Sequence, residues 1–60
     1  MTNMLWQYAP LNERMAVYGH YTEWENKTGK QIYDSFEDFD EHHRDMNYFF
    51  VVNYWMELDA

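Results

Sequence analysis

Carboxylates crowded into one short segment, residues 34–45, are the side chains of this sequence best placed to do chemistry. Six acidic residues and a single arginine give the segment a charge of −5, against −7 for the whole chain. The acidic residues are Asp34, Glu37, Asp38, Asp40, Glu41 and Asp45. Carboxylates grouped in this way can act as general acid and base, coordinate a metal ion or bind a basic partner. Their spacing and the rest of the chain decide among these uses.

Acid–base catalysis is the use that the sequence supports least. With helical periodicity, most of the carboxylates fall on the convex face of one helix rather than in a cleft. The chain has no cysteine, one serine and no glycine-rich phosphate loop, so the usual residues of nucleophilic and nucleotide chemistry are missing. We therefore expect a protein that is not an enzyme, with no catalytic residues and no cofactor.

A metal site is suggested by the adjacent His42 and His43, but adjacent residues do not face the same way on a helix. Asp38 and His42, four residues apart, would supply two ligands, which is half a site. His20 is a conceivable third ligand. The simpler interpretation is that His43 packs beside Phe39 while His42 is solvated, and we expect no metal.

Partner binding is the use that the spacing favours. Glu37, Glu41 and Asp45 are like charges at successive i,i+4 positions, and each such pair destabilises a helix by roughly 0.2–0.5 kcal/mol. Carboxylates four residues apart rise about 6 Å along a helix, a spacing of the same order as that of phosphates along a nucleic-acid strand. The row could therefore imitate a phosphate backbone and occupy a groove lined with Lys and Arg. The alternative is a solvated face that only keeps the protein soluble.

One short helix must position these carboxylates. Ser35 is a favourable N-cap, and Asp38 three residues later completes a capping pattern. A stripe that would face the core consists of Phe36, Phe39, His43 and Met46. We expect Phe36 and Phe39 to be buried against a sheet.

The flanking segments predict that sheet. Residues 15–24 alternate as a strand, residues 25–30 form a turn, and residues 30–33 form a second strand of a hairpin. Residues 48–58, rich in aromatic and β-branched side chains, give the strongest strand signal. The expected fold is a single α+β domain, residues 1–60, with a small antiparallel sheet and the order β-β-α-β. A helix over residues 11–18, ended by Gly19, stays open as an alternative, and residues 4–8 could be a short strand or an ordered arm.

The segment at residues 48–58 is apolar on both faces, so it needs cover on both sides. One helix covers one face, which leaves the N-terminal arm, a second copy of the chain or a target for the other. We therefore expect that the chain can form a homodimer. So small a core cannot hold all the aromatic residues, so some among Trp6, Trp24, Tyr54 and Trp55 should remain at the surface. Trp24 and Trp55 are our candidate aromatic contacts to a partner.

The net charge of −7 and the pI of about 4.5 exclude several partners and favour one class. Direct binding of nucleic acid or of an anionic membrane surface needs basic side chains. A basic protein surface suits the charge. The longest apolar run, residues 48–52, is far too short to span a bilayer, and no targeting segment is visible, so we expect a cytoplasmic protein.

The size, acidity and aromatic content of the chain resemble those of small phage-encoded inhibitors of host defence, the anti-restriction and anti-CRISPR DNA mimics. The run from Gly29 through Asp34 to Phe39, followed by an aromatic segment, is similar to a strand–helix–strand piece of ArdA-type anti-restriction domains. This likeness covers about half of the chain, and that family is longer. The resemblance implies inhibition of an enzyme that handles nucleic acid, in the host cytoplasm if the protein is phage-encoded.

The sequence thus predicts an inhibitor that binds the basic nucleic-acid-binding surface of a host enzyme or defence complex and blocks access of DNA or RNA. The alternative is a structural or regulatory interaction module that binds through the aromatic surface of residues 48–58, with acids that only solvate. Salt separates these functions, because binding by charge weakens steeply as ionic strength rises.

Overall fold

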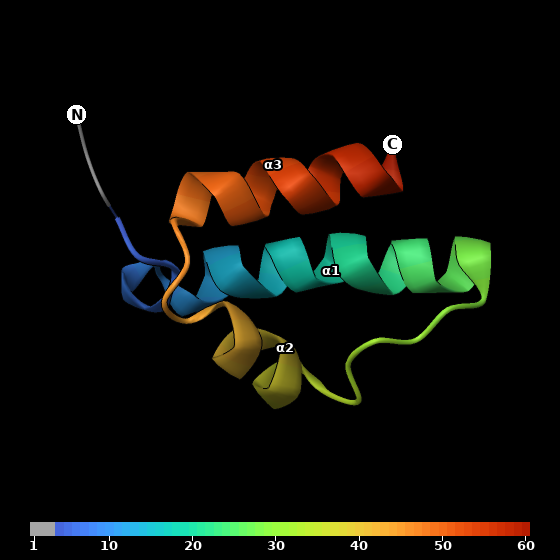
Figure 1. The fold of residues 1–60 in the computed structure, drawn as a ribbon, viewed down its shortest axis with the longest axis horizontal. Coiled ribbons are helices and arrows are strands. Elements are labelled where there is room, and N and C mark those ends of the chain that lie inside the picture. Colours follow the sequence, from blue (N-terminus) through green and yellow to red (C-terminus); the bar gives the residue numbers. More distant parts are fainter. Residues whose placement is uncertain (1–3) are drawn as a thin grey trace.

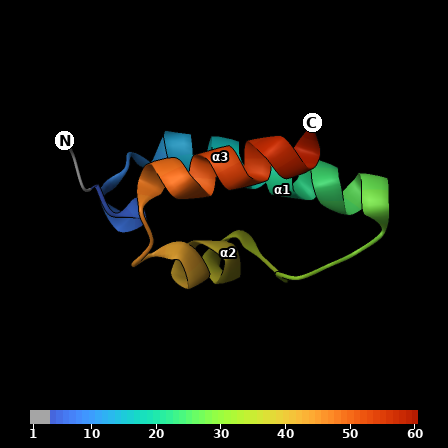
Figure 2. The same cartoon turned by 45° about the horizontal axis from the view of Figure 1, so that its top comes forward.

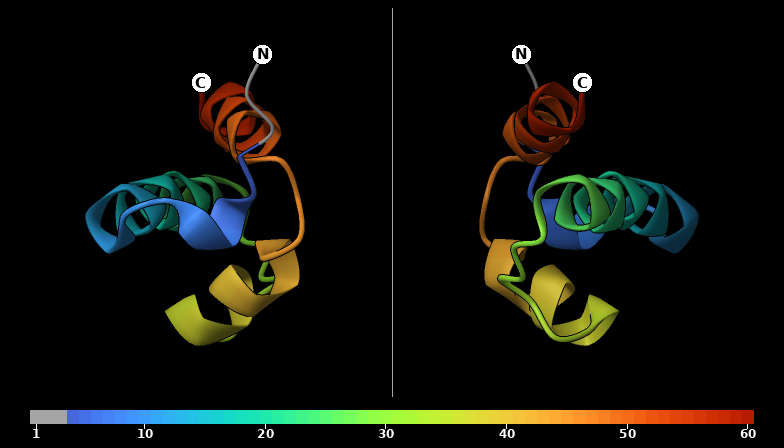
Figure 3. Two further views of the ribbon diagram at one scale, coloured as in Figure 1. Left: turned by 90° about the vertical axis from the view of Figure 1, so that its left-hand side faces the viewer. Right: turned by 90° about the vertical axis from the view of Figure 1, so that its right-hand side faces the viewer.

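A computed structural model describes residues 4–60 and shows three α-helices preceded by one short 3-10 helix. The elements in chain order are η1 (Trp6–Tyr8), α1 (Leu11–Thr28), α2 (Phe36–His43) and α3 (Tyr48–Asp59). α1 and α3 run side by side in the same direction, and the chain returns between them through a long loop and α2 (Figure 1). Seen end-on, the three helices surround a common centre (Figure 3).

The predicted α+β fold is wrong. Within residues 4–60 the one β feature is an isolated antiparallel bridge between Leu5 and Asn47. The predicted strand over 15–24 lies inside α1, residues 30–33 are loop, and the predicted strand over 48–58 lies inside α3. The described chain is a small, mostly helical domain, and it lacks the strand–helix–strand piece that the resemblance implied.

α3 shows why the strand prediction failed. Val51, Trp55 and Asp59 are spaced i,i+4,i+8 and are all buried, which is the pattern of one helix face. The Asn47 side chain accepts a hydrogen bond from the backbone N–H of Phe50 at 3.1 Å and caps the helix. Aromatic and β-branched residues favour strands by at most about 1 kcal/mol, so burial of this face decides the conformation. A run of this length also exceeds most strands.

α1 differs from both structures predicted for its segment, the strand over residues 15–24 and the helix over residues 11–18. Pro10 precedes the helix, and Gly29 ends it in the left-handed region at φ 74°. The helical alternative for residues 11–18 therefore had the right conformation and start, but Gly19 lies in the helix interior rather than at its end. A glycine inside a helix costs roughly 0.5–1 kcal/mol relative to alanine, which burial of Val17 and Tyr21 on one face can offset.

α2 confirms the predicted acidic helix. The Ser35 hydroxyl accepts a hydrogen bond from the Asp38 backbone N–H at 3.2 Å, as the capping pattern indicated. Phe39 and His43 are buried, Phe36 is half-buried, and Met46 is exposed. The buried side of α2 packs on α1 and η1 rather than on a sheet.

The N-terminal segment covers the core between α2 and α3. Trp6 is fully buried, and its backbone N–H donates to the Met46 carbonyl at 2.8 Å. The Tyr48 backbone N–H donates in turn to the Met4 carbonyl at 2.8 Å. Residues 4–8 are therefore an ordered arm with one bridge and a 3-10 turn.

Aromatic rings make up most of the core. Tyr21 lies at its centre, 5.7 Å from the Phe39 ring centroid and 5.2 Å from that of Trp55. The Tyr21 hydroxyl accepts hydrogen bonds from the backbone N–H groups of Ile32 and Tyr33, both at 2.9 Å. This buried hydroxyl fixes the loop that leads into α2, and burial raises the pKa of Tyr21.

Candidate partner-binding surface

The acidic surface consists of the carboxylates on the outer side of α2 and at its two ends. Five of the six predicted residues are exposed: Asp34, Glu37, Asp38, Glu41 and Asp45. Arg44 is the one Lys or Arg in this segment, and its guanidinium approaches Glu41 at 3.4 Å and Asp45 at 3.8 Å. These long, exposed contacts neutralise little of the charge. α2 lies on one side of the α1–α3 pair, so its outer side faces away from the rest of the molecule (Figure 2).

Asp40, the sixth predicted residue, is engaged within the fold. Its Oδ1 accepts hydrogen bonds from Trp6 Nε1 at 2.7 Å and Arg14 Nη1 at 2.8 Å, and Arg14 Nη1 also lies 2.7 Å from Oδ2. Arg14 Nε donates to the Ala9 carbonyl at 2.9 Å. This carboxylate therefore ties the N-terminal arm and α1 to α2, instead of standing free beside the other acids.

The two predicted tryptophans do not lie on the open surface. Trp55 is 1% exposed, and its Nε1–H donates to His43 Nε2 at 3.3 Å. Trp24 is half-buried and packs against Trp55, with ring centroids 5.6 Å apart. Trp55 therefore cannot touch a partner in this conformation, and Trp24 offers only part of its ring.

Other apolar residues take that place on α3. The helix exposes five large apolar side chains, each between 40% and 59% exposed: Phe49, Phe50, Tyr54, Met56 and Leu58. The strand predicted for residues 48–58 had placed four of them on one apolar face and Phe49 on the other. The prediction that some of the candidate aromatic residues remain at the surface is therefore confirmed for Tyr54, which is 49% exposed.

An apolar groove runs between α2, α3 and the loop before α2. Phe50 and Tyr54 stack with ring centroids 6.2 Å apart and line it together with the exposed Ile32 and Met46. Its buried walls include Tyr33, and its volume is about 220 Å³. On the helical wheel, Asp38 precedes His42, a groove residue, by one turn. An acidic side chain therefore stands beside the groove.

The two histidines of α2 differ as predicted. His43 is 4% exposed and lies against Phe39, with ring centroids 4.5 Å apart, whereas His42 is exposed and its Nδ1 lies 2.8 Å from the Tyr33 hydroxyl. His43 Nδ1 can donate to the Phe39 carbonyl at 2.7 Å while Nε2 accepts from Trp55. This arrangement suits the neutral imidazole, and desolvation lowers the pKa of His43.

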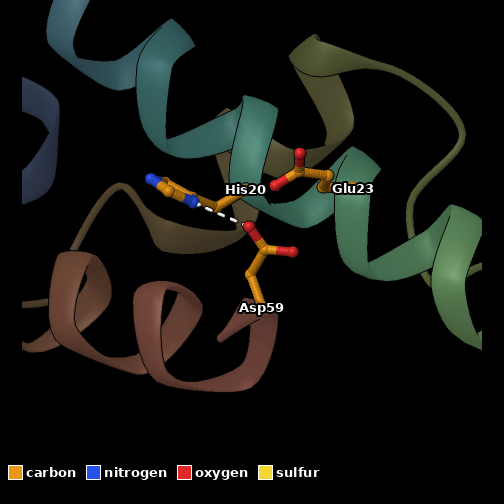
Figure 4. Close-up of side chains that lie close together, drawn as sticks. All are labelled: His20, Glu23 and Asp59. Atoms are coloured by element: carbon orange, nitrogen blue, oxygen red, sulfur yellow. Dashed lines mark hydrogen bonds and ion pairs between the residues drawn. The ribbon is translucent and has the colours of Figure 1, made fainter.

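A cluster of polar side chains that the sequence did not reveal joins α1 to the end of α3. His20 and Glu23 lie three residues apart on α1 and point toward Asp59 of α3 (Figure 4). One potential ligand atom from each lies within 4.8 Å of the others. The pKa of Asp59 is lowered to about 2, chiefly because the Glu23 carboxyl can share a proton with it, and the pKa of Glu23 is raised for the same reason.

The sequence indicates this cluster only if residues 20–23 are predicted to be helical. The i,i+3 spacing of His20 and Glu23 places them on one helix face, whereas the predicted strand would have placed them on opposite faces. Asp38 and His42, the predicted half-site, do not join His20 in any cluster of three metal-binding side chains within residues 4–60.

Comparison with models of protein families, with curated protein sequences and with solved structures finds no match to this chain. In the part of the chain that the structure describes, no helix combines the length and the apolar character needed to cross a membrane.

Proposed function

We propose that this protein binds a basic, nucleic-acid-binding surface of another protein and blocks access of DNA or RNA to it. The observation that supports the proposal is the set of five exposed carboxylates on α2 and its flanks, with Arg44 as the one Lys or Arg in the segment. Glu37 and Glu41 stand one turn apart on the outer side of the helix, so their rise is about 6 Å. The proposal is for an inhibitor of the DNA-mimic class that acts in the cytoplasm.

Charge is the physical basis of this binding. A surface built to bind nucleic acid carries Lys and Arg side chains that hold condensed phosphate charge, and a row of carboxylates can take the place of those phosphates. The attraction raises the rate of encounter and is screened by salt. Asp40 is excluded from the contact set because it binds Trp6 and Arg14, and Trp55 is excluded by its burial.

The apolar face of α3 favours a second candidate, an interaction module that docks through Phe49, Phe50 and Tyr54 while the acids only solvate. Exposed large apolar side chains on one helix are typical of surfaces that meet another protein. A second copy of the chain is one possible occupant, although a net charge of −7 on each copy opposes self-association. Sedimentation at micromolar concentration measures this, because a homodimer would have twice the mass of the 7.5 kDa chain.

Matched charge variants test the first candidate. Glu37→Gln with Glu41→Gln removes two charges from α2 at nearly constant volume, and Glu13→Gln with Glu57→Gln removes two exposed charges elsewhere. Glu13 accepts a hydrogen bond from the Tyr48 hydroxyl at 2.9 Å, which a glutamine oxygen can also accept. Both double variants should therefore fold.

The readout is capture of nucleic-acid-binding proteins from a bacterial lysate on the immobilised chain, eluted with a salt gradient and, separately, with duplex DNA. The α2 variant should lose most of the captured protein and elute at lower salt, while the control variant elutes like the parent. Duplex DNA should elute the captured proteins, because it competes with the chain for the same basic surface. Retention by the α2 variant equal to that of the parent would overturn the proposal, and loss on Phe50→Ser with Tyr54→Ser alone would favour the second candidate.

A further inference from the structure

The polar cluster between α1 and the last turn of α3 has features of a ligand site rather than of a solvated surface. Asp59 is 6% exposed, and its Oδ2 lies 2.9 Å from His20 Nδ1. Its Oδ1 is buried and has no hydrogen-bond partner among the described residues. A buried carboxylate oxygen left without a hydrogen bond is costly, so it calls for a cation.

Lys27 supplies part of that charge. Its ammonium lies 3.1 Å from Asp59 Oδ1, without the geometry of a hydrogen bond, and donates to the Asp59 carbonyl. The Lys27 side chain is 55% exposed, so solvent reaches its contacts with Asp59. Glu23 adds a second carboxylate on the open side of the cluster. Glu23 and Asp59 together bring two carboxylates to the cluster, against the single ammonium of Lys27.

We propose that His20, Glu23 and Asp59 form a binding site for a divalent metal ion, with Zn²⁺ as the ion that fits the donors. Zinc binds imidazole nitrogen and carboxylate oxygen at about 2.0–2.2 Å, and tetrahedral ligands at that range lie about 3.4 Å apart. The distance of 2.9 Å between His20 and Asp59 and the upper limit of 4.8 Å across the cluster bracket this value. Three protein ligands leave a fourth position for water.

The local structure favours such a site. Asp59 is held by burial at the end of α3, whereas Glu23 is exposed and the His20 side chain is 39% exposed, so both can adjust by rotation. Figure 4 shows the three side chains converging from two helices. A bound ion would join the middle of α1 to the C-terminal turn of α3. Its effect would be structural, because an ion that binds the folded chain stabilises it.

Calorimetric titration of Zn²⁺ into the metal-free 60-residue chain tests the proposal, with thermal unfolding as a second readout. We expect one equivalent to bind and the melting temperature to rise. His20→Gln and Glu23→Gln should each weaken binding at least about tenfold. Glu23 is exposed, so its variant keeps the fold if His20→Gln does not. Lys27→Gln should bind several-fold more tightly, because it removes the competing cation.

His42→Gln with Glu41→Gln is the matched control, since it removes an exposed histidine and an exposed carboxylate from α2. This variant should bind Zn²⁺ like the parent, and Zn²⁺ should shift the imidazole NMR signals of His20 rather than those of His42. Absence of binding at millimolar Zn²⁺, or equal affinity in the parent, His20→Gln and Glu23→Gln chains, would overturn the proposal. Neither outcome bears on the function proposed for α2.

Discussion

α2 and α3 both present a broad side to solvent, and the two sides are chemical opposites. The outer side of α2 carries Glu37 and Glu41, whereas that of α3 carries Phe49 and Phe50. Both helices nevertheless send one large aromatic ring to the same core, Phe39 from α2 and Trp55 from α3, with ring centroids 5.9 Å apart. In both helices the inner residues stabilise the fold, and the outer residues are available to bind a partner.

Truncation of the inner rings is the largest expected effect and should be the same for both helices. Phe39→Ala and Trp55→Ala each remove a ring that is at most 1% exposed, at a cost of about 3–5 kcal/mol. That is close to the whole stability of a small domain. Circular dichroism should show loss of the cooperative melt. Phe49→Ala, at 52% exposed, is the control and should melt close to the parent. A cooperative melt retained by Phe39→Ala would contradict the inner role of α2.

The two neighbouring carboxylates Asp40 and Glu41 should differ in stability. Asp40→Asn removes the ion pair with Arg14 and weakens the acceptor of the Trp6 indole N–H, which should cost about 1–3 kcal/mol. Glu41→Gln, on the exposed side, should change stability by at most about 0.5 kcal/mol. Urea unfolding of both variants measures the difference. Equal midpoints would show that Asp40 belongs with the solvated acids after all.

Lowering the pH should destabilise the contact between α2 and α3 through His43. Desolvation lowers the pKa of His43 below its ordinary value of 6.5, so the unfolded chain binds a proton that the folded chain does not. Stability should fall by up to about 1.4 kcal/mol per pH unit as the pH drops below about 6.5, until the lower folded pKa is reached. The neighbouring groups that carry or can gain charge are His42 and Asp40. Unfolding of the parent and of His43→Leu between pH 7.5 and 5 measures this, and an unchanged slope in the variant would contradict it.

The N-caps should give the smallest effect and should again make the two helices alike. Ser35→Ala removes the acceptor for the Asp38 N–H, and Asn47→Ala removes the acceptor for the Phe50 N–H. Each should cost about 1 kcal/mol, within the usual 0.5–2 range. Thermal melts of the two variants provide the measurement. A much larger loss for Asn47→Ala would indicate that the bridge between Leu5 and Asn47 also depends on this side chain.

The sequence was sufficient for α2 because the signals of this helix are local. The N-cap Ser35, the capping residue Asp38 and the buried positions Phe39 and His43 all lie within nine residues of one another, and each was predicted correctly. The exposure of Glu37 and Glu41 follows from the same period. Local hydrogen bonds and helical spacing need no distant partner, so they can be predicted from the sequence.

Tertiary structure alone decided the rest. Residues 15–24 and 48–58 hold apolar patterns that fit a strand or a helix. Only burial in the common core, where Tyr21 meets Trp55, selects the helix. The role of Asp40 depends on Trp6, 34 positions away, and the cluster at Asp59 depends on His20, 39 positions away. A carboxylate in solvent and one that meets a cation across the fold look the same in sequence, because the difference lies in contacts that exist only after the helices have packed.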